Sequence, residues 1–389
     1  MEASFYIHVP FCSGLCAYCD FYSVLVRQGE ERLERYLDRV LLDAGETAVR
    51  FNVGPVPTVY IGGGTPSVLG ASGIRRLLKG LEVFWPYGAP AEITVEANPE
   101  TADLLFLESC REAGATRISL GVQSFHEPSR KAAGRAGDGR ILPERLAMVS
   151  EIFPHAFSAD LISGLPLQDE AALLKDLEAL LAYGPAHVSL YALTLEKGTP
   201  LYEAYRAGKG PALPPPDEAD RLWIQGRDFL EQSGYHQYEV SNFCLPGKES
   251  RHNLRYWRME NWLGLGPGAS GTVIDDEQGR GLRVTVKSDV ESWLDRPQGD
   301  QGATEEMIAA PALIRESLLM GFRYCGGPDP ALFKKRFRLN LEDVLPRTLA
   351  SWRGKGLLRE GRAALNAEGL LFLDRFLIEA FAEIDAAGF

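Results

Sequence analysis

Three cysteines near the start of the chain carry the most distinctive chemistry of the sequence. Cys12 and Cys16 are separated by three residues, and Cys16 and Cys19 by two. Thiolates this close together bind zinc or an iron–sulfur cluster. A structural zinc ion needs four ligands, usually from two separated pairs, and no second pair occurs in this sequence. Three thiolates on a [4Fe–4S] cluster would instead leave one iron without a protein ligand, where a substrate can coordinate.

The rest of the composition indicates a globular chain in which disulfides play no part. Of its 389 residues, 45% are hydrophobic and 24% charged. Cys110, Cys244 and Cys325 stand alone and are predicted to be small buried hydrophobic side chains. Because the start of the sequence lacks a signal peptide and no apolar run could span a bilayer, we expect a cytoplasmic protein without a transmembrane segment. The net charge of −12 argues against a nucleic-acid partner.

The elements that must position the cysteines form a regular pattern over the first half of the chain. Short segments rich in β-branched and aromatic residues alternate with amphipathic helical stretches, which predicts a parallel sheet, either doubly wound or curled into a barrel. In both cases functional groups lie at the C-terminal ends of the strands. The cysteines follow the first strand, GGGTP follows the second, Glu96 and Gln123 end the third and fourth, and Asp160 lies in the fifth. The six segments are SFYIHVP, TVYIGGG, EITVEANP, TRISLGVQSF, AFSADLISGLP and HVSLYALTLEKGTP.

The pattern changes after the sixth strand. A Pro-rich connector, residues 208–220, leads into a helix, and a short GYHQYEVSNF segment and a Gly-rich stretch follow. From about residue 305 helices resume, and LLREGRAALNAEGLLFLDRFLIEAF predicts two strands and a closing helix, as in a winged-helix module packed on the barrel. We therefore predict three parts: 1–210, 211–300 and 301–389.

Several motifs together resemble those of the radical S-adenosylmethionine (SAM) superfamily. YIHVPFCSGLCAYCDFYS, YIGGGTPS, ISLGVQSF, DLISGLP, YALTLEKGTP, GYHQYEVSNF and RHNLRYW are similar to its oxygen-independent coproporphyrinogen III oxidase-like branch, and within it to the heme chaperones. The resemblance implies a partial (β/α)6 barrel with a mainly helical C-terminal module. It also implies a [4Fe–4S] cluster on Cys12, Cys16 and Cys19, with SAM as the ligand of the fourth iron.

The resemblance also assigns residues to the SAM pocket. Backbone approach to the amino group of SAM would require glycine, and charged groups would pair with the polar parts of the cofactor. The assigned residues are Tyr6 at the sulfonium, Tyr18 on the adenine side, Gly63, Gly64 and Thr65 at the amino group, Glu96 and Gln123 at other polar groups, Arg135 at the carboxylate and Asp160 at the ribose.

Two departures from the oxidases favour the chaperones. The oxidases continue with a further cysteine two places after the third, where this chain has Phe21, and their longer N-terminal extension is missing. RHNLRYW fits the chaperones' His-Asn-x-x-Tyr-Trp motif, in which His252 could be an axial heme ligand and Asn253, Tyr256 and Trp257 could border a porphyrin.

The resemblance therefore favours a protein that binds heme and delivers it to acceptors such as respiratory proteins, and it leaves peripheral membrane contact open. The alternative is a catalytic radical SAM enzyme, either a coproporphyrinogen III oxidase or a methyltransferase; SAM cleavage is compatible with both hypotheses. Of the other histidines, His8 is expected to face the barrel interior. His126, His155, His187 and His236 are expected to cap, pack or face solvent.

Overall fold

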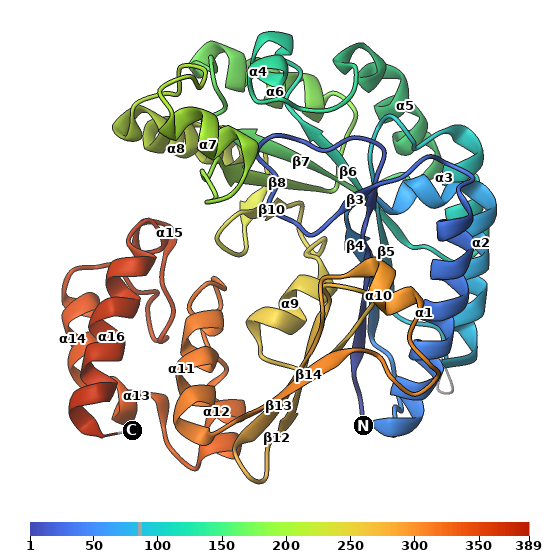
Figure 1. The fold of residues 1–389 in the computed structure, drawn as a ribbon. Coiled ribbons are helices and arrows are strands. Elements are labelled where there is room, and N and C mark those ends of the chain that lie inside the picture. Colours follow the sequence, from blue (N-terminus) through green and yellow to red (C-terminus); the bar gives the residue numbers. More distant parts are fainter. Residues whose placement is uncertain (85–87, 389) are drawn as a thin grey trace.

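A curved sheet of twelve strands forms the framework of the protein (Figure 1). The computed structural model describes residues 1–84 and 88–388. All six strands predicted from the first half of the sequence are present, lie in chain order and run parallel. They are β1 (Ser4–Val9), β4 (Thr58–Gly63), β5 (Glu92–Ala97), β6 (Arg117–Gln123), β7 (Phe157–Ser163) and β8 (His187–Ala192).

The helices between these strands cover the outer face of the sheet (Figure 1). Their apolar stripes pack on the strands in one core, to which Leu37, Leu77 and Leu177 belong. Asp103 and Asp169 each cap a helix by accepting a backbone N–H of its first turn. The helices are α1 (Glu31–Arg50), α2 (Gly70–Leu81), α3 (Leu104–Glu112), α4 (Glu127–Ala132), α5 (Leu142–Ile152) and α6 (Glu170–Leu181).

The six parallel strands do not close on themselves, because β1 pairs next with β11 and β8 pairs next with β10. The fold is the predicted partial (β/α)6 barrel. Its sheet is extended at one end by β11 (Trp262–Leu265), which is parallel to β1, and then by the antiparallel β12 (Ser270–Asp275), β13 (Arg280–Val286) and β14 (Ala303–Ile308). At the other end lie β10 (Asn242–Cys244) and β9 (His236–Gln237).

Short elements connect these parts. The Pro-rich connector ends in a helix as expected, and the cysteine segment is held by a small two-stranded sheet. In the part of the chain that the structure describes, no helix is long and apolar enough to cross a membrane. The connecting elements are β2 (Phe11–Cys12), β3 (Val24–Leu25), α7 (Pro200–Arg206), α8 (Pro216–Gln232), α9 (Arg251–Trp257) and α10 (Val290–Leu294).

The C-terminal part is helical and has a core of its own around Phe322, Trp352 and Phe376. The expected pair of strands here is wrong: only an isolated bridge forms, between Leu358 and Leu365, because Asn366 at once caps the next helix. Since β14 belongs to the large sheet, this core starts after residue 308. Its helices are α11 (Ala310–Gly321), α12 (Pro330–Phe337), α13 (Leu341–Val344), α14 (Pro346–Gly354), α15 (Ala367–Leu370) and α16 (Leu373–Ala387).

Candidate cofactor site

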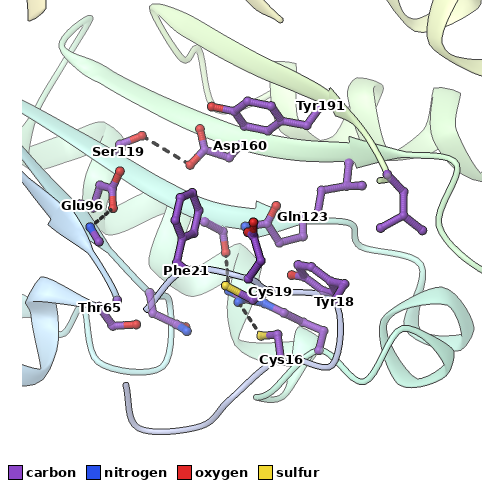
Figure 2. A pocket seen from close by; sticks show the side chains of 18 of the residues that line it. Cys16, Tyr18, Cys19, Phe21, Thr65, Glu96, Ser119, Gln123, Asp160 and Tyr191 are labelled. Atoms are coloured by element: carbon purple, nitrogen blue, oxygen red, sulfur yellow. Dashed lines mark hydrogen bonds between the residues drawn. The ribbon is translucent and has the colours of Figure 1, made fainter. Parts of the chain in front are cut away.

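A cavity of about 380 Å³ opens at the C-terminal ends of the parallel strands, beneath the cysteine segment. Figure 2 shows Cys16, Cys19 and Tyr18 on one side of this cavity and the carboxyl groups of Glu96 and Asp160 on the other. Every residue assigned to the SAM pocket lines this cavity except Tyr6. The lining assigned residues are Tyr18, Gly63, Gly64, Thr65, Glu96, Gln123, Arg135 and Asp160.

The three cysteines lie on the segment that crosses the mouth of the barrel: Cys12 ends β2, and Cys16 and Cys19 follow in the loop to β3 and line the cavity. The loop is tied down by two backbone hydrogen bonds of Ala17, whose N–H donates to the carbonyl of Gly134 and whose carbonyl accepts from Leu201. All three thiols are partly exposed, and their Sγ atoms do not all lie within 4.8 Å of one another, as the ligands of one metal ion would. A [4Fe–4S] cluster attaches each thiolate to a different iron, so its cysteines need not converge on one point as the ligands of a single ion must.

Two glycines let the cysteine loop lie directly on β4. A Cβ on Gly64 would stand 2.6 Å from the carbonyl oxygen of Phe11 and 2.9 Å from that of Val9. Gly63 has a φ of +107°, and a Cβ there would stand 2.5 Å from Nδ1 of His8. A side chain at Gly64 would therefore push the start of the cysteine segment off β4, and one at Gly63 would collide with the ring of His8 on β1.

Arg135 and Tyr18 join the cysteine loop to the cavity wall. Arg135 donates from Nη1 to Sγ of Cys16 over 3.1 Å and from Nη2 to the carbonyl of Gly121 over 2.8 Å. Burial alone would lower the pKa of Arg135, but the Tyr18 hydroxyl and the Cys16 thiol beside it raise it overall, so the guanidinium stays charged. The hydroxyl of Tyr18 is buried without a hydrogen-bond partner in the described residues, which leaves a donor for a ligand in the cavity.

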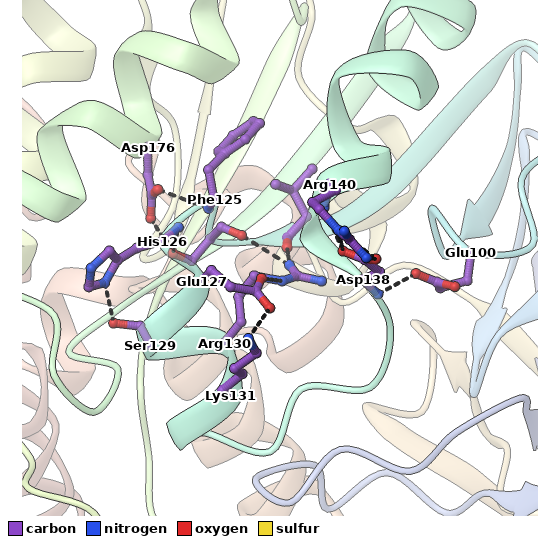
Figure 3. A network of polar contacts seen from close by, with 12 residues as sticks. Glu100, Phe125, His126, Glu127, Ser129, Arg130, Lys131, Asp138, Arg140 and Asp176 are labelled. Atoms are coloured by element: carbon purple, nitrogen blue, oxygen red, sulfur yellow. Dashed lines mark hydrogen bonds and ion pairs between the residues drawn. The ribbon is translucent and has the colours of Figure 1, made fainter.

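A network of polar contacts holds the segment that presents Arg135 (Figure 3). Arg130 donates from Nη1 to the carbonyls of Val122 and Ser124, over 2.8 and 3.0 Å. Asp176 on α6 accepts from the hydroxyl of Ser124 and from the N–H of Phe125. These contacts fix the turn after β6 to α6, so the guanidinium of Arg135 is positioned by the fold.

Two carboxyl groups face the cavity, one from β5 and one from β7, with β6 between them. Glu96 accepts from the hydroxyl of Tyr60 over 2.6 Å and from the N–H of Gly63 over 3.1 Å. Burial raises the pKa of Glu96 to about 7, and Asp160 adds to the shift. Burial also raises the pKa of Asp160, against the hydrogen bond from Ser189. Both carboxyl groups would be ionised more readily beside a positively charged ligand.

Replacing Glu96 by glutamine is expected to change how stability depends on pH. Because the folded pKa of about 7 lies above the unfolded value of 4.5, Glu96 lowers the free energy of unfolding as pH rises from about 4.5 to 7, and the loss is complete above 7. Relative to wild type, Glu96→Gln should therefore gain on the order of 2 kcal/mol between pH 5 and pH 8.

Urea unfolding at several pH values measures this change. Glu178→Gln, on the exposed face of α6, is the control and should follow wild type. A constant difference between Glu96→Gln and wild type would contradict the raised pKa.

Gln123 stands where β6 departs from regular geometry. Its φ is +69°, and the pairing of β6 with β7 shifts between Gly121 and Gln123. Such irregularities turn a side chain at the end of a strand, here into the cavity. Two inward-facing side chains that the sequence motifs did not indicate, Ser119 on β6 and Tyr191 on β8, also line the cavity. Counting back in steps of two from Gln123 would have found Ser119.

Tyr6 lies deeper in the barrel than predicted. It stacks on Tyr60 with ring centres 6.3 Å apart, and its hydroxyl lies 3.0 Å from Nδ1 of His8. Nε2 of His8 lies 2.9 Å from the carbonyl oxygen of Tyr22, so Nε2 carries the proton and Nδ1 accepts from Tyr6. Since burial lowers the pKa of His8, the ring is neutral. As predicted, His8 faces the interior, where it links β1 to the cysteine loop.

Comparison with known proteins shows the family to which the chain belongs. Residues 6–180 match the family model described as the radical SAM superfamily. The chain is 38% identical to the heme chaperone HemW of Escherichia coli over 72% of this chain and 73% of that protein. The chain belongs to the HemW family of radical SAM proteins. Membership of the radical SAM superfamily implies a [4Fe–4S] cluster and SAM.

Two further comparisons cover nearly the whole chain. A bovine (Bos taurus) protein, the mitochondrial radical S-adenosyl methionine domain-containing protein 1, is 33% identical over 99% of this chain and 89% of its own length. The solved structure of coproporphyrinogen III oxidase HemN from E. coli superimposes with a TM-score of 0.79 over 97% of this chain and 90% of that chain, at 24% identity. The second comparison shows a shared fold.

The His-Asn-x-x-Tyr-Trp segment of this HemW family member lies at the opposite, N-terminal ends of the strands. Buried Glu92, at the start of β5, accepts from the N–H groups of Arg251 and His252 over 3.0 and 2.9 Å and so anchors the first turn of α9. His252 is fully buried and stacks on Tyr60 with ring centres 5.1 Å apart. The segment thus closes the base of the barrel.

Both ring nitrogens of His252 already have partners. Nδ1 lies 2.7 Å from Oγ1 of Thr58, and Nε2 lies 2.8 Å from the hydroxyl of Tyr256. Burial lowers the pKa of His252 to about 3, so the ring is neutral. Asn253 faces an internal cavity of about 40 Å³, and Trp257 borders the C-terminal helices. Because His252 is fully buried and both of its ring nitrogens are occupied, the structure does not support the hypothesis of direct heme ligation by His252.

Replacing His252 by alanine is expected to destabilise the fold without selectively removing heme binding. The change leaves the Tyr256 hydroxyl unpaired and opens a cavity, which should lower the free energy of unfolding by about 2–4 kcal/mol. Urea unfolding and hemin titration measure the two effects, with exposed His155→Asn as control. A well-folded His252→Ala protein that no longer binds hemin would restore His252 as the ligand.

Proposed function

We propose that this chain binds heme and delivers it to acceptor proteins. Its membership of the HemW family carries the proposal, because HemW is named a heme chaperone. The cysteine loop supports it: at the position where the resemblance expects a further cysteine in the oxidases, this chain has Phe21, whose side chain is 65% exposed beside the cavity. The acceptors would be heme proteins such as those of respiration.

The cavity residues fit a bound cluster and SAM. Cys12, Cys16 and Cys19 are the proposed ligands of the cluster. Cluster and SAM together supply one-electron chemistry, the reductive cleavage of a carbon–sulfur bond. The chain's part is to bind and orient these groups: the guanidinium of Arg135 is placed for a carboxylate, and Gly63 and Gly64 allow close approach of the backbone.

The opposite wall of the cavity supplies acceptors. The carboxyl group of Glu96 is placed to accept from an amine, and that of Asp160 from ribose hydroxyls. The amide of Gln123 is available for the other polar groups of SAM. A proposed location in the cytoplasm is supported by the six unpaired cysteines, which suit a reducing compartment.

One anaerobic experiment tests the proposed function. Cluster-loaded protein is incubated with reductant, SAM and coproporphyrinogen III, and porphyrins and 5'-deoxyadenosine are separated by chromatography. The same preparation is titrated with hemin and then mixed with a heme-free b-type cytochrome, whose absorption reports heme transfer. We expect untouched coproporphyrinogen, hemin binding and transfer to the cytochrome faster than from free hemin.

Two results would overturn the proposal. Protoporphyrinogen formed in step with 5'-deoxyadenosine would identify an oxidase. Transfer no faster than from free hemin would remove the chaperone activity. The variant Phe21→Cys extends the test, because an oxidase that depends on a thiol at this position would gain activity from it, whereas a chaperone would not.

A further inference from the structure

Three side chains that ligate metals lie together on the edge of the sheet, away from the cofactor cavity. They are His236, Cys244 and Glu249, and their ligand atoms all lie within 4.8 Å of one another. Nε2 of His236 is 3.8 Å from Sγ of Cys244 and 3.7 Å from Oε1 of Glu249. Cys244 pairs with His187 at the start of β8, whereas the cavity lies at the far ends of the strands.

The backbone brings these residues together. His236 and Cys244 are direct partners in the antiparallel pair of β9 and β10, so their side chains share one face. The chain then reverses in a turn closed by the hydrogen bond from the N–H of Lys248 to the carbonyl of Leu245, with Gly247 at a φ of +73°. The reversal returns Glu249 to the hairpin. The spacing of the three ligands is thus set by strand register and a turn.

The ligand types select the metal. Imidazole and thiolate with one carboxylate suit a borderline ion such as Zn²⁺, whereas Mg²⁺ and Ca²⁺ take oxygen ligands. Tetrahedral zinc at its usual bond lengths holds neighbouring N and S atoms about 3.5 Å apart and neighbouring N and O atoms about 3.4 Å apart. Nε2 of His236 lies 3.8 Å from Sγ of Cys244 and 3.7 Å from Oε1 of Glu249. Small movements of the side chains of His236 and Glu249 would bring the ligand atoms to the distances of a zinc site.

We propose that His236, Cys244 and Glu249 bind a zinc ion with an open fourth position. Cys244 is buried at the base, while the side chains of His236 and Glu249 are 46% and 31% exposed, so the ion and a fourth ligand enter from solvent. On binding, the thiol of Cys244 releases its proton to solvent. The site braces the loop that leads to Ser250, whose hydroxyl caps α9. It is separate from the proposed heme delivery.

Cobalt is the first probe, because a thiolate on tetrahedral Co²⁺ gives a charge-transfer band and visible d–d bands. The cluster cysteines would compete, so the full-length chain carrying Cys12→Ser, Cys16→Ser and Cys19→Ser is titrated with Co²⁺ alone. We expect one cobalt per chain with the tetrahedral thiolate spectrum, displaced by Zn²⁺.

Further substitutions in this background locate the site. His236→Asn, at an exposed position, and Glu249→Gln, at a half-buried one, should weaken binding at least roughly tenfold. Cys244→Ser should remove the charge-transfer band. His155→Asn, at an exposed histidine, should change nothing.

The cluster-loaded wild-type protein provides a second measurement. After dialysis against Zn²⁺, it should contain one zinc per chain besides its iron, and His236→Asn should lose the zinc while keeping the iron. A Co²⁺ spectrum typical of octahedral coordination only, or an equal affinity for Co²⁺ in all variants, would overturn the proposed site. Hemin binding measured in the same variants should not change, so failure of this site and failure of the proposed heme function are distinguishable.

Discussion

Replacing any one of Cys12, Cys16 or Cys19 by serine is expected to abolish the iron–sulfur cluster. Three thiolates supply all the protein ligands of the proposed cluster, so the loss of one leaves two irons without a protein ligand. The broad absorbance near 400 nm and the iron content after anaerobic reconstitution should both fall to background. SAM binding should weaken as well, because the fourth iron is lost with the cluster.

Cys110→Ala is the matched control for these variants. Cys110 is fully buried in the barrel core and is not among the residues that line the cavity, so this variant should keep its iron. A serine variant with a full complement of four irons would show that the ligands are assigned wrongly. Circular dichroism distinguishes loss of the cluster from loss of the fold.

Gly63→Ala is expected to disrupt the cofactor cavity, while Gly114→Ala should leave it intact. Both glycines have a similar positive φ, +107° and +102°, so both substitutions carry a backbone cost of about 1–3 kcal/mol. A Cβ at Gly63 also meets Nδ1 of His8 at 2.5 Å, whereas a Cβ at Gly114 meets nothing within 4 Å.

The displaced ring cannot move freely, because its nitrogens are held by Tyr6 and Tyr22. Because Nε2 of His8 is hydrogen-bonded to the carbonyl of Tyr22, a movement of His8 should also displace the end of the cysteine loop. We expect SAM to bind at least roughly tenfold more weakly to Gly63→Ala, a loss of about 1.4 kcal/mol or more. Equilibrium dialysis of SAM with the two cluster-loaded variants measures the difference. Equal affinities would mean that the contact with His8 does not shape the cavity.

The positions of most cavity residues could be predicted because they depend on local pattern and a general rule. Glu96 and Gln123 end predicted strands, and the C-terminal ends of parallel strands meet at one edge of the sheet. The rule does not place Tyr6 correctly. Tyr6 points inward, but three residues before the end of β1, which places it below the cavity among Tyr60 and His8.

Other features depend on contacts between distant parts of the chain. The RHNLRYW motif indicated histidine chemistry, yet the surroundings of His252 are set by Thr58 and Glu92 on two strands of the barrel. His236 and Cys244 were expected to be a solvent-facing or packed histidine and a buried hydrophobic residue. Their meeting depends on the register of two short strands, and residue types do not reveal register.

The central place of β1 in the sheet has a consequence for how the protein is made. On one side β1 pairs with β4, which follows it closely in the chain. On the other side it pairs with β11, about 250 residues later, where Trp262 lies opposite Ser4. The strand that leads into the cysteines is thus made well before β11 and is among the last of the parallel strands to complete its pairing. The sheet on both sides of this strand is therefore complete only after β11 has been made. A chain cut at residue 210 would keep one edge of β1 open and prone to aggregate.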